Sequence, residues 1–303
     1  MPKKKISIIM NCYNAEKFLK DALQSILLQN YENWELIFYD NQSNDKSYQI
    51  YKSFNDKRFK YYKSKKFEKL GVARKKALSK AKGEFVIFFD SDDVLLKNKL
   101  HTQLKFFSNK NVGFVITNSL FFNDKRSKIL FNSNKIFEKN IFYKLIENYF
   151  ISFDTVMMRL SFIKKLDHGL DERFNIIHDM DLLTRLSKIS EMRYVPTILS
   201  KWRMRDDSLS YNSYINIINE KKIFIKKINK KFKSDQKFLK SKAIFMDALY
   251  RQEILYSLTK KNYKKIYRLV KKLKFNFKNF ILIFLIFVPF KRYIFKNLLN
   301  IKF

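Results

Sequence analysis

Hydrophobic residues follow two different spacings in the first 95 residues of the chain. Short runs of aliphatic, β-branched and aromatic residues are typical of strands that are buried on both faces. Between these runs, apolar residues recur at the spacing of one helix face. The alternation predicts an α/β fold in which a mostly parallel sheet carries helices on both faces. The predicted strands cover residues 6–10, 34–39, 59–62 and 83–89, and the predicted helices cover residues 18–27 and 70–82.

Acidic side chains gather where the predicted strands end. Asp40 follows the second strand, and Asp90, Ser91, Asp92 and Asp93 follow the fourth. The carboxyl ends of parallel strands share one edge of the sheet, where α/β proteins bind ligands. Neighbouring carboxylates repel one another unless they share a cation, and Mg²⁺ or Mn²⁺ held through oxygen ligands is the usual partner. The turn therefore predicts a divalent metal site at Asp92, although a solvated turn or a helix cap would use the same residue types.

A basic residue lies near the start of the second predicted helix. Arg74 can face a phosphate there with help from the helix dipole, and Asp40 offers an acceptor for a ribose or a base. The chain has only four glycines, and they are too far apart for a P-loop or a G-x-G-x-x-G turn. The sheet edge therefore predicts a nucleotide-diphosphate site without a glycine-rich loop.

Composition limits the class of protein. A chain of 303 residues with 46% hydrophobic content can bury a core as one large domain, or as one domain with an appendage. The single cysteine, Cys12, excludes an intramolecular disulfide and suits a reducing compartment. We therefore expect a folded cytoplasmic protein.

Positive charge is concentrated in the last quarter of the chain. Residues 1–220 hold 39 Lys and Arg against 25 Asp and Glu, whereas residues 221–303 hold 24 against 3. The apolar run at 280–290 is too short for a bilayer span of roughly 20 residues but suits an interfacial helix. With basic residues on both sides of it, we predict a peripheral contact with an anionic membrane surface at the inner face of the cell membrane. A buried helical hairpin with a solvated basic face is the alternative, and we expect no cleavable signal at the start of the chain.

Several ordered segments resemble the family-2 glycosyltransferases of the GT-A fold. The resemblance rests on residues 7–14, 40–45, 71–74, 89–93 and 178–182. It implies a GT-A-type nucleotide-binding sheet and an inverting enzyme that moves a sugar from a nucleotide diphosphate to a hydroxyl group, with Mn²⁺ or Mg²⁺ as cofactor. The residues expected at the donor nucleotide are Asn11, Tyr13, Asp40, Arg74, Asp90 and Ser91, and the residue expected at the metal is Asp92.

Two positions depart from the family pattern. Asn41 stands where the family commonly has an Asp, and His178 stands where it commonly has a Glu. The first departure bears on base selectivity. The second leaves the neighbouring carboxylate, Asp179, intact.

Asp179 is the expected general base. An inverting displacement needs one carboxylate to take the proton of the acceptor hydroxyl, and departure of a metal-bound diphosphate needs no general acid. The alternative is that Asp179 only caps the helix that follows it. The family resemblance favours the catalytic role.

Two further residues are expected on the acceptor or diphosphate side. His178 precedes the expected base, although a lone histidine beside a helix start is more often a structural hydrogen bonder. Arg205 stands where the family segment has a His; it cannot ligate a metal, but it can pair with a diphosphate. The alternative is a surface basic strand that pairs with Asp206 and Asp207.

The domain prediction places a catalytic domain at residues 1–215 and a basic, mostly helical appendage at residues 216–303. We expect a uridine-diphosphate sugar as donor, a glycan or lipid-linked acceptor in surface polysaccharide synthesis, and no nucleic-acid partner. The alternatives are a basic nucleic-acid-binding protein, which a pI near 10 would suit, and a catalytically silent membrane scaffold. The acidic turn argues against the first because it would repel phosphate in the absence of a metal, and the retained Asp92 and Asp179 argue against the second.

Overall fold

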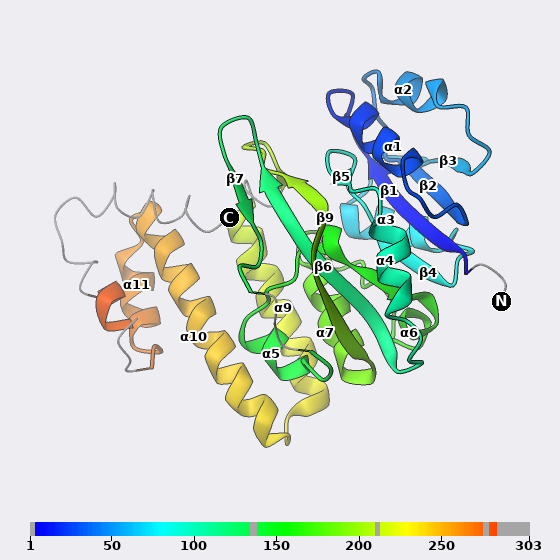
Figure 1. The fold of residues 1–303 in the computed structure, drawn as a ribbon. Helices are drawn as coiled ribbons and strands as arrows, with labels where there is room; N and C mark the ends of the chain where they lie inside the picture. Colours follow the sequence, from blue (N-terminus) through cyan, green and yellow to red (C-terminus); the bar gives the residue numbers. More distant parts are fainter. Residues whose placement is uncertain (1–3, 134–137, 210–212, 275–278, 284–303) are drawn as a thin grey trace. The chain divides into compact units, whose positions relative to one another are not determined.

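The computed structural model describes residues 4–133, 138–209, 213–274 and 279–283, and it divides into two compact units. Unit 1 contains Met1–Phe142 and Phe150–Arg205, and unit 2 contains Tyr143–Tyr149 and Asp206–Phe303 (Figure 1). The division at Asp206 lies close to residue 216, where the sequence places the start of the appendage. Whether the two units are separate functional domains stays a prediction.

Unit 1 is built on one mixed sheet, and the predicted fold class is confirmed. The order of the strands is β3-β2-β1-β4-β8-β6-β9-β5, with β7 paired to β6 outside this path. The strands are β1 (Ile6–Cys12), β2 (Trp34–Asp40), β3 (Phe59–Lys63), β4 (Phe85–Phe88), β5 (Val94–Leu95), β6 (Val112–Phe122), β7 (Ser127–Ile129), β8 (Met157–Arg159) and β9 (Glu191–Arg203).

The first four strands form the parallel half that the sequence predicts. β1 pairs in parallel with both β2 and β4, and β2 pairs in parallel with β3. Both faces are covered, as the unbroken apolar runs require. On one face, Ile8 and Met10 of β1 pack in the main core cluster with α1 (Leu19–Leu27). On the other face lies α3 (Leu70–Leu78), which ends before the predicted residue 82.

The second half of the sheet differs from the mostly parallel prediction. β8 runs antiparallel to both β4 and β6, and β5 runs antiparallel to β9. Among the described strands of this half, the long pairing of β6 with β9 is the parallel one. The prediction rested on the βαβ alternation of the first 95 residues, and the short β8 and β5 carry too few residues to show a period.

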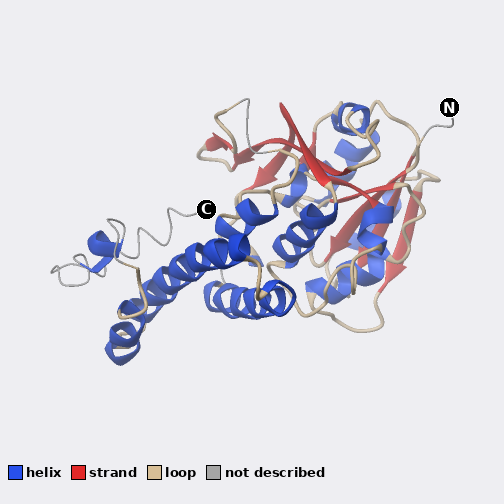
Figure 2. Ribbon diagram, turned by 90° about the horizontal axis from the view of Figure 1, so that it is seen from below, coloured by secondary structure: helices blue, strands red, loops and turns tan. Residues whose placement is uncertain are grey.

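Helices flank this sheet on both sides (Figure 2). Besides α1 and α3, the helical elements of unit 1 are α2 (Ser47–Ser53), α4 (Lys99–Lys105), the 3₁₀ turn η1 (Phe153–Thr155), α6 (Leu160–Lys164) and α7 (His178–Ile189).

Unit 2 is helical and basic, as the sequence predicts. Its helices are α9 (Tyr214–Phe232), α10 (Gln236–Thr259) and α11 (Tyr263–Val270), and most of α5 (Phe142–Glu147) belongs to it. Ile254, Leu258, Ile266 and Leu269 form an apolar cluster with Leu282. Most of the apolar run at 280–290 lies outside the described residues. Within the described part of the chain, every helix falls short of the length and hydrophobicity that a membrane span needs.

Candidate active site

The carboxyl ends of three parallel strands bring the predicted residues to one edge of unit 1. Cys12 at the end of β1 lies opposite Asp40 at the end of β2. On the other side of β1, Ile9 pairs with Phe88 at the end of β4, and the amide of Phe89 donates to the Ile9 carbonyl over 2.9 Å. Asn11 and Asp40, at the ends of their strands, and Asp90, in the turn after β4, therefore lie at the same edge of the sheet.

Asp40 is buried, and its side chain is held by β3 and by the turn that follows β2. Its carboxylate accepts a hydrogen bond from the Tyr61 hydroxyl at 2.7 Å and from the Ser43 amide at 2.8 Å. Burial, and then the hydrogen bond to Asp40, raises the pKa of Tyr61, so this phenol stays a donor. The side chain at Asp40 is thus fixed before any ligand arrives.

The hydrogen bonds of Asn41 explain why an Asn stands where the family commonly has an Asp. Its side-chain NH₂ donates to the Glu68 carbonyl at 2.8 Å, while its side-chain oxygen accepts from the Glu68 amide at 3.0 Å. A carboxylate at this position could accept one of these bonds but could not donate the other. Asn41 therefore joins the Asp40 turn to the segment before α3.

Asn11 lies near the end of β1, and Tyr13 lies in the loop that follows the strand. Both polar atoms of the Asn11 side chain are buried, and neither has a hydrogen-bond partner among the described residues. Tyr13 is 51% exposed, and its ring centroid lies 4.7 Å from that of Phe67, which is 59% exposed. An exposed aromatic pair beside unused amide groups is a suitable surface for a planar ligand. Phe67 does not stand out in the sequence, because a single aromatic residue in a loop carries no periodic signal.

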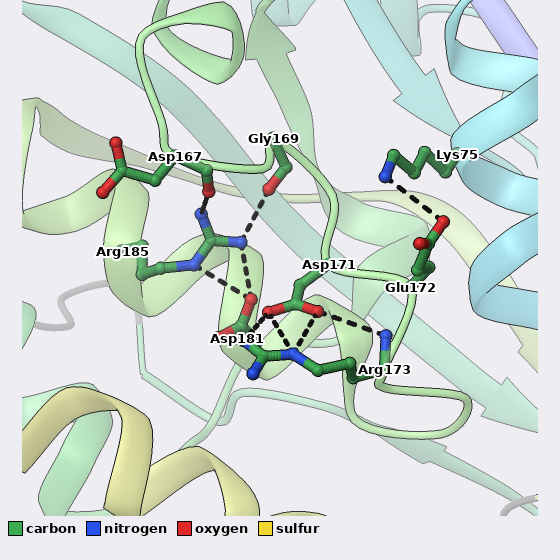
Figure 3. Close-up of polar contacts among 8 residues, drawn as sticks. All are labelled: Lys75, Asp167, Gly169, Asp171, Glu172, Arg173, Asp181 and Arg185. Atoms are coloured by element: carbon green, nitrogen blue, oxygen red, sulfur yellow. Dashed lines mark hydrogen bonds and ion pairs between the residues drawn. The ribbon is translucent and has the colours of Figure 1, made fainter.

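The start of α3 packs closely against the segment that leads into α7. A Cβ added at Gly71 would lie 2.0 Å from the carbonyl oxygen of Phe174, so only glycine fits there. The Leu70 amide donates to Asn175 Oδ1 at 2.6 Å, and Lys75 pairs with Glu172 at 3.2 Å (Figure 3). These contacts bring α3 to residues that lie about 100 positions later in the sequence.

Arg74 is the centre of this contact. It is 4% exposed, and its guanidinium contacts the Asp90 carboxylate and His178 Nε2. It also lies over the ring of Phe153, 5.5 Å from the centroid. Burial, and then the charge of Arg74, lowers the pKa of His178 well below its ordinary value, so the imidazole is neutral. This burial favours the structural interpretation of His178 that the sequence left open.

Asp92 is paired with the other predicted cation. Its Oδ2 lies 2.9 Å from Arg205 Nη1, and its carbonyl accepts from Arg203 Nε at 2.8 Å. Burial, and then the charge of Asp90, raises the pKa of Asp92, while Arg205 opposes the shift. Ser91, between the two acidic residues, is half-buried. Asp90 and Asp92 thus each have a guanidinium partner.

Asp179 lies in the first turn of α7 and is half-buried. The N-cap position belongs to Ile177, so Asp179 lies inside the helix rather than at its cap. Two residues on, the buried Asp181 accepts from Arg185 Nε at 2.9 Å. Arg185 also donates to the Gly169 carbonyl at 2.6 Å, which fixes the loop before α7 to the helix (Figure 3).

Behind the acidic turn lies a buried polar cluster that the sequence analysis missed. Lys99 is 0% exposed, and within the part of the chain that the structure describes its ammonium has no hydrogen-bond partner. Burial lowers the pKa of Lys99 to about 7, against the opposing charge of Asp154. Asp154 accepts from the hydroxyls of Ser119 and Ser200 at 2.7 and 2.6 Å. A lone lysine in a helix carries no sequence signal that distinguishes it from the many lysines of this chain.

The donor set around Asp92 fits a divalent cation that binds together with a phosphate ligand. In the described ranges, no cluster of three His, Cys, Asp or Glu side chains is arranged to hold a metal. Mg²⁺ and Mn²⁺ are often held by one or two carboxylates, with substrate phosphates and water completing the shell. Asp90 and Asp92 could supply that much.

Comparison with known proteins identifies a family for the N-terminal half of the chain. The model of glycosyl transferase family 2 matches residues 7–167. A curated relative from Escherichia coli, UDP-Glc:alpha-D-GlcNAc-diphosphoundecaprenol beta-1,3-glucosyltransferase WfgD, is 30% identical over 213 residues, which are 69% of this chain and 81% of the relative.

Two solved structures share the fold at low sequence identity. Residues 1–349 of Staphylococcus aureus TarS, in complex with UDP, superpose with a TM-score of 0.60 at 20% identity, over 82% of this chain and 71% of that one. The mannosyltransferase PcManGT from Pyrobaculum calidifontis, in complex with GDP-Man and Mn²⁺, gives a TM-score of 0.59 at 15% identity, over 82% and 72%.

Proposed function

Because the chain belongs to glycosyl transferase family 2 and is a glycosyltransferase, we propose that it moves a sugar from a uridine-diphosphate sugar to a hydroxyl of a glycan or lipid-linked acceptor, with inversion at the anomeric carbon. The observation that carries the proposal is the Asp90–Asp92 turn. This turn lies at the carboxyl edge of the sheet, with Arg74 on one carboxylate and Arg205 on the other. A diphosphate bound there would lie close to the metal ligand in the turn and to the two guanidinium groups that reach the turn from α3 and from the segment after β9.

The donor nucleotide would occupy the edge between β1 and β2. Asp40 would accept from the nucleoside, Asn11 would use its unsatisfied amide, and Tyr13 with Phe67 would cover the planar base. The uridine choice draws on the donor named for WfgD and the ligand named for TarS. PcManGT holds a guanosine donor, so the test below compares both bases.

The metal would be Mn²⁺ or Mg²⁺ at Asp92, and Asp90 and Ser91 would contact the nucleotide. When bound, the cation would neutralise the charge that develops on the leaving diphosphate. The side chains of this chain act around it: Arg74 orients Asp90, and Arg203 holds the backbone of Asp92 at 2.8 Å.

Asp179 would be the general base. Its place in the first turn of α7 is rigid, because the loop before the helix is fixed through Arg185 and because α3 packs on the segment at Phe174. A base mounted there would take the proton of the acceptor hydroxyl as the hydroxyl attacks the anomeric carbon. Neutral His178 beside it would hold Arg74 in place.

The acceptor and the cellular location belong to the same proposal. WfgD is named for an acceptor carried on diphosphoundecaprenol, a lipid. A basic unit 2 at an anionic membrane surface would place this chain where such acceptors lie. Either a hexose or an N-acetylhexosamine would suit this proposal.

The test is a donor screen with purified protein. Thermal unfolding with uridine diphosphate, guanosine diphosphate or short DNA, each with and without Mn²⁺, should show a shift for uridine diphosphate that depends on Mn²⁺. Transfer or slow hydrolysis of nucleotide sugars under the same conditions would then identify the sugar. A shift with DNA alone would favour the nucleic-acid alternative and overturn the proposal.

A further inference from the structure

Arg205 and Asp92 form an ion pair that the proposed metal would have to open. Arg205 Nη1 lies 2.9 Å from Asp92 Oδ2, and the two side chains are 26% and 22% exposed. The pair is therefore partly desolvated but still within reach of solvent and of ions.

The segment after β9 is held in place before it reaches Arg205. β9 pairs antiparallel with β5, with Lys201 opposite Val94. The Arg203 amide then donates to Asp93 Oδ1 at 2.9 Å. Because Arg205 follows this anchor by only two residues, its backbone has little freedom, while its long side chain can still turn.

The aromatic ring of Phe18 lies close to the guanidinium groups of both Arg203 and Arg205. The guanidinium carbon of Arg203 lies 4.3 Å from the centroid of the Phe18 ring, and that of Arg205 lies 5.2 Å from it. Arg203 is further paired with Asp21 at 3.6 Å and so stays in place. The attraction of a guanidinium to an aromatic face contributes only about 0.5–1 kcal/mol at an exposed site, so the contact with Phe18 does not fix Arg205 in place.

Electrostatics sets Arg205 against a metal. A guanidinium at Asp92 offsets the repulsion from Asp90, which otherwise makes ionised Asp92 unfavourable. A divalent cation at the same carboxylate would repel that guanidinium at short range. A diphosphate brought by the metal would attract it, and an arginine fork matches phosphate oxygens well.

We propose that Arg205 is the resting counter-ion of Asp92, which metal and diphosphate together displace, and that the displaced guanidinium then binds the diphosphate. This inference rests on the proposed function and adds a sequence of contacts to it. Metal alone has to compete with the guanidinium and binds weakly. Metal with diphosphate removes the competitor and gives it a new partner.

In the test, the substitution Arg205→Gln should change the affinity for Mn²⁺ alone and the affinity for diphosphate in opposite directions. Arg205→Gln removes the charge, Arg205→Lys keeps it, and Arg193→Gln is the matched control, since Arg193 pairs with Glu191 at 2.9 Å in the early part of β9, the strand that precedes Arg205. Mn²⁺ binding without nucleotide is measured by electron paramagnetic resonance of free Mn²⁺. Binding of uridine diphosphate and of uridine monophosphate at saturating Mn²⁺ is measured by calorimetry.

We expect Arg205→Gln to bind Mn²⁺ alone about 10-fold more tightly than the unaltered protein. The same variant should bind uridine diphosphate with Mn²⁺ about 10-fold more weakly, with a smaller change for uridine monophosphate. Arg205→Lys should lie between the two proteins, and Arg193→Gln should match the unaltered protein in every measurement.

Each other outcome has a definite meaning. Equal or weaker Mn²⁺ binding by Arg205→Gln would overturn the counter-ion role, and joint loss of both affinities would show a merely structural role. Equal or tighter diphosphate binding would overturn the second contact. If the unaltered protein bound no nucleotide with any metal, the proposed function would fail, while the comparison of Mn²⁺ alone would still decide the ion pair.

Discussion

The two units treat charge in different ways. In unit 1, charges meet in specific pairs at the sheet edge, such as Arg74 with Asp90 and Arg205 with Asp92. In unit 2, cations greatly outnumber anions. One buried carboxylate, that of Glu253, pairs with both Lys222 and Lys265 at 2.7 Å. A charge in unit 1 therefore acts through its position, whereas most charges in unit 2 act through their number. Single substitutions should accordingly have large effects in unit 1 and small ones in unit 2.

The largest effect on donor binding is expected from a substitution at Asp92 in unit 1. Asp92→Asn should abolish Mn²⁺-dependent binding of uridine diphosphate and all measurable transfer, because an amide is a poor ligand for a hard cation. Calorimetry with uridine diphosphate and Mn²⁺ gives the measurement. Asp56→Asn, which removes a surface carboxylate paired with Arg58 at 2.6 Å, is the control. Unchanged affinity in Asp92→Asn would remove this residue from the metal site.

The next effect separates catalysis from binding within unit 1. Asp179→Asn should lower turnover by roughly 10²- to 10⁴-fold while donor affinity stays nearly intact, the usual contribution of a positioned base. Steady-state rates and donor binding are measured on the same preparation. Glu172→Gln, an exposed carboxylate before the same helix, should keep full turnover. If Asp179→Asn lost binding and turnover equally, its role would be structural.

A substitution at Lys99 tests whether a buried charge of unit 1 without a close partner lowers the stability of the fold. Its pKa is lowered by burial to about 7 from an ordinary 10.5, so between these values the unfolded chain holds a proton that the folded chain lacks. The contribution of Lys99 to stability therefore rises as pH increases from about 7 to about 10.5 and is most unfavourable below this window. Lys99→Met should raise the free energy of unfolding by about 2–4 kcal/mol at pH 7 and remove this rise.

Denaturant unfolding at several pH values checks the prediction for Lys99. Lys105→Met, at the exposed end of the same helix, should change stability by less than about 0.5 kcal/mol. Loss of stability in Lys99→Met would mean that the buried ammonium compensates Asp154 and is not an isolated charge.

The smallest effect on donor binding is expected from unit 2. Deleting residues 284–303 should leave the affinity for uridine diphosphate within about 2-fold and should reduce sedimentation with anionic liposomes. The deletion starts after residue 283 because Leu282 packs in the apolar cluster and Asn279 donates to Asp247 at 2.8 Å. A deletion from residue 275 would remove both contacts. Equal sedimentation of the two proteins would refute the membrane prediction. Loss of donor binding would show that unit 2 contributes to the donor site, against the contrast drawn between the two units.

The sequence predicts local features of unit 1 better than its distant contacts. The strands that end at Asp40 and near Asp90 follow from unbroken apolar runs, and both turns lie at the predicted edge. The partners of Arg74 and Arg205 do not follow, because each pairs with a residue that is far away in the sequence or on another element. Strands of two or three residues, such as β5 and β8, are likewise too short to show a period.

The residue separation of the Arg205–Asp92 pair has a consequence for biosynthesis. The ribosome makes Asp92 113 residues before Arg205, and Arg74 104 residues before His178. Domains begin to fold from the N-terminus during synthesis, at about 5–20 residues per second. A nascent chain that has completed the parallel strands thus carries its acidic turn without Arg205 for several seconds. Premature termination between residues 160 and 204 would release a product with β1–β8 but without this counter-ion, so every shortened product of this kind lacks the assembled site.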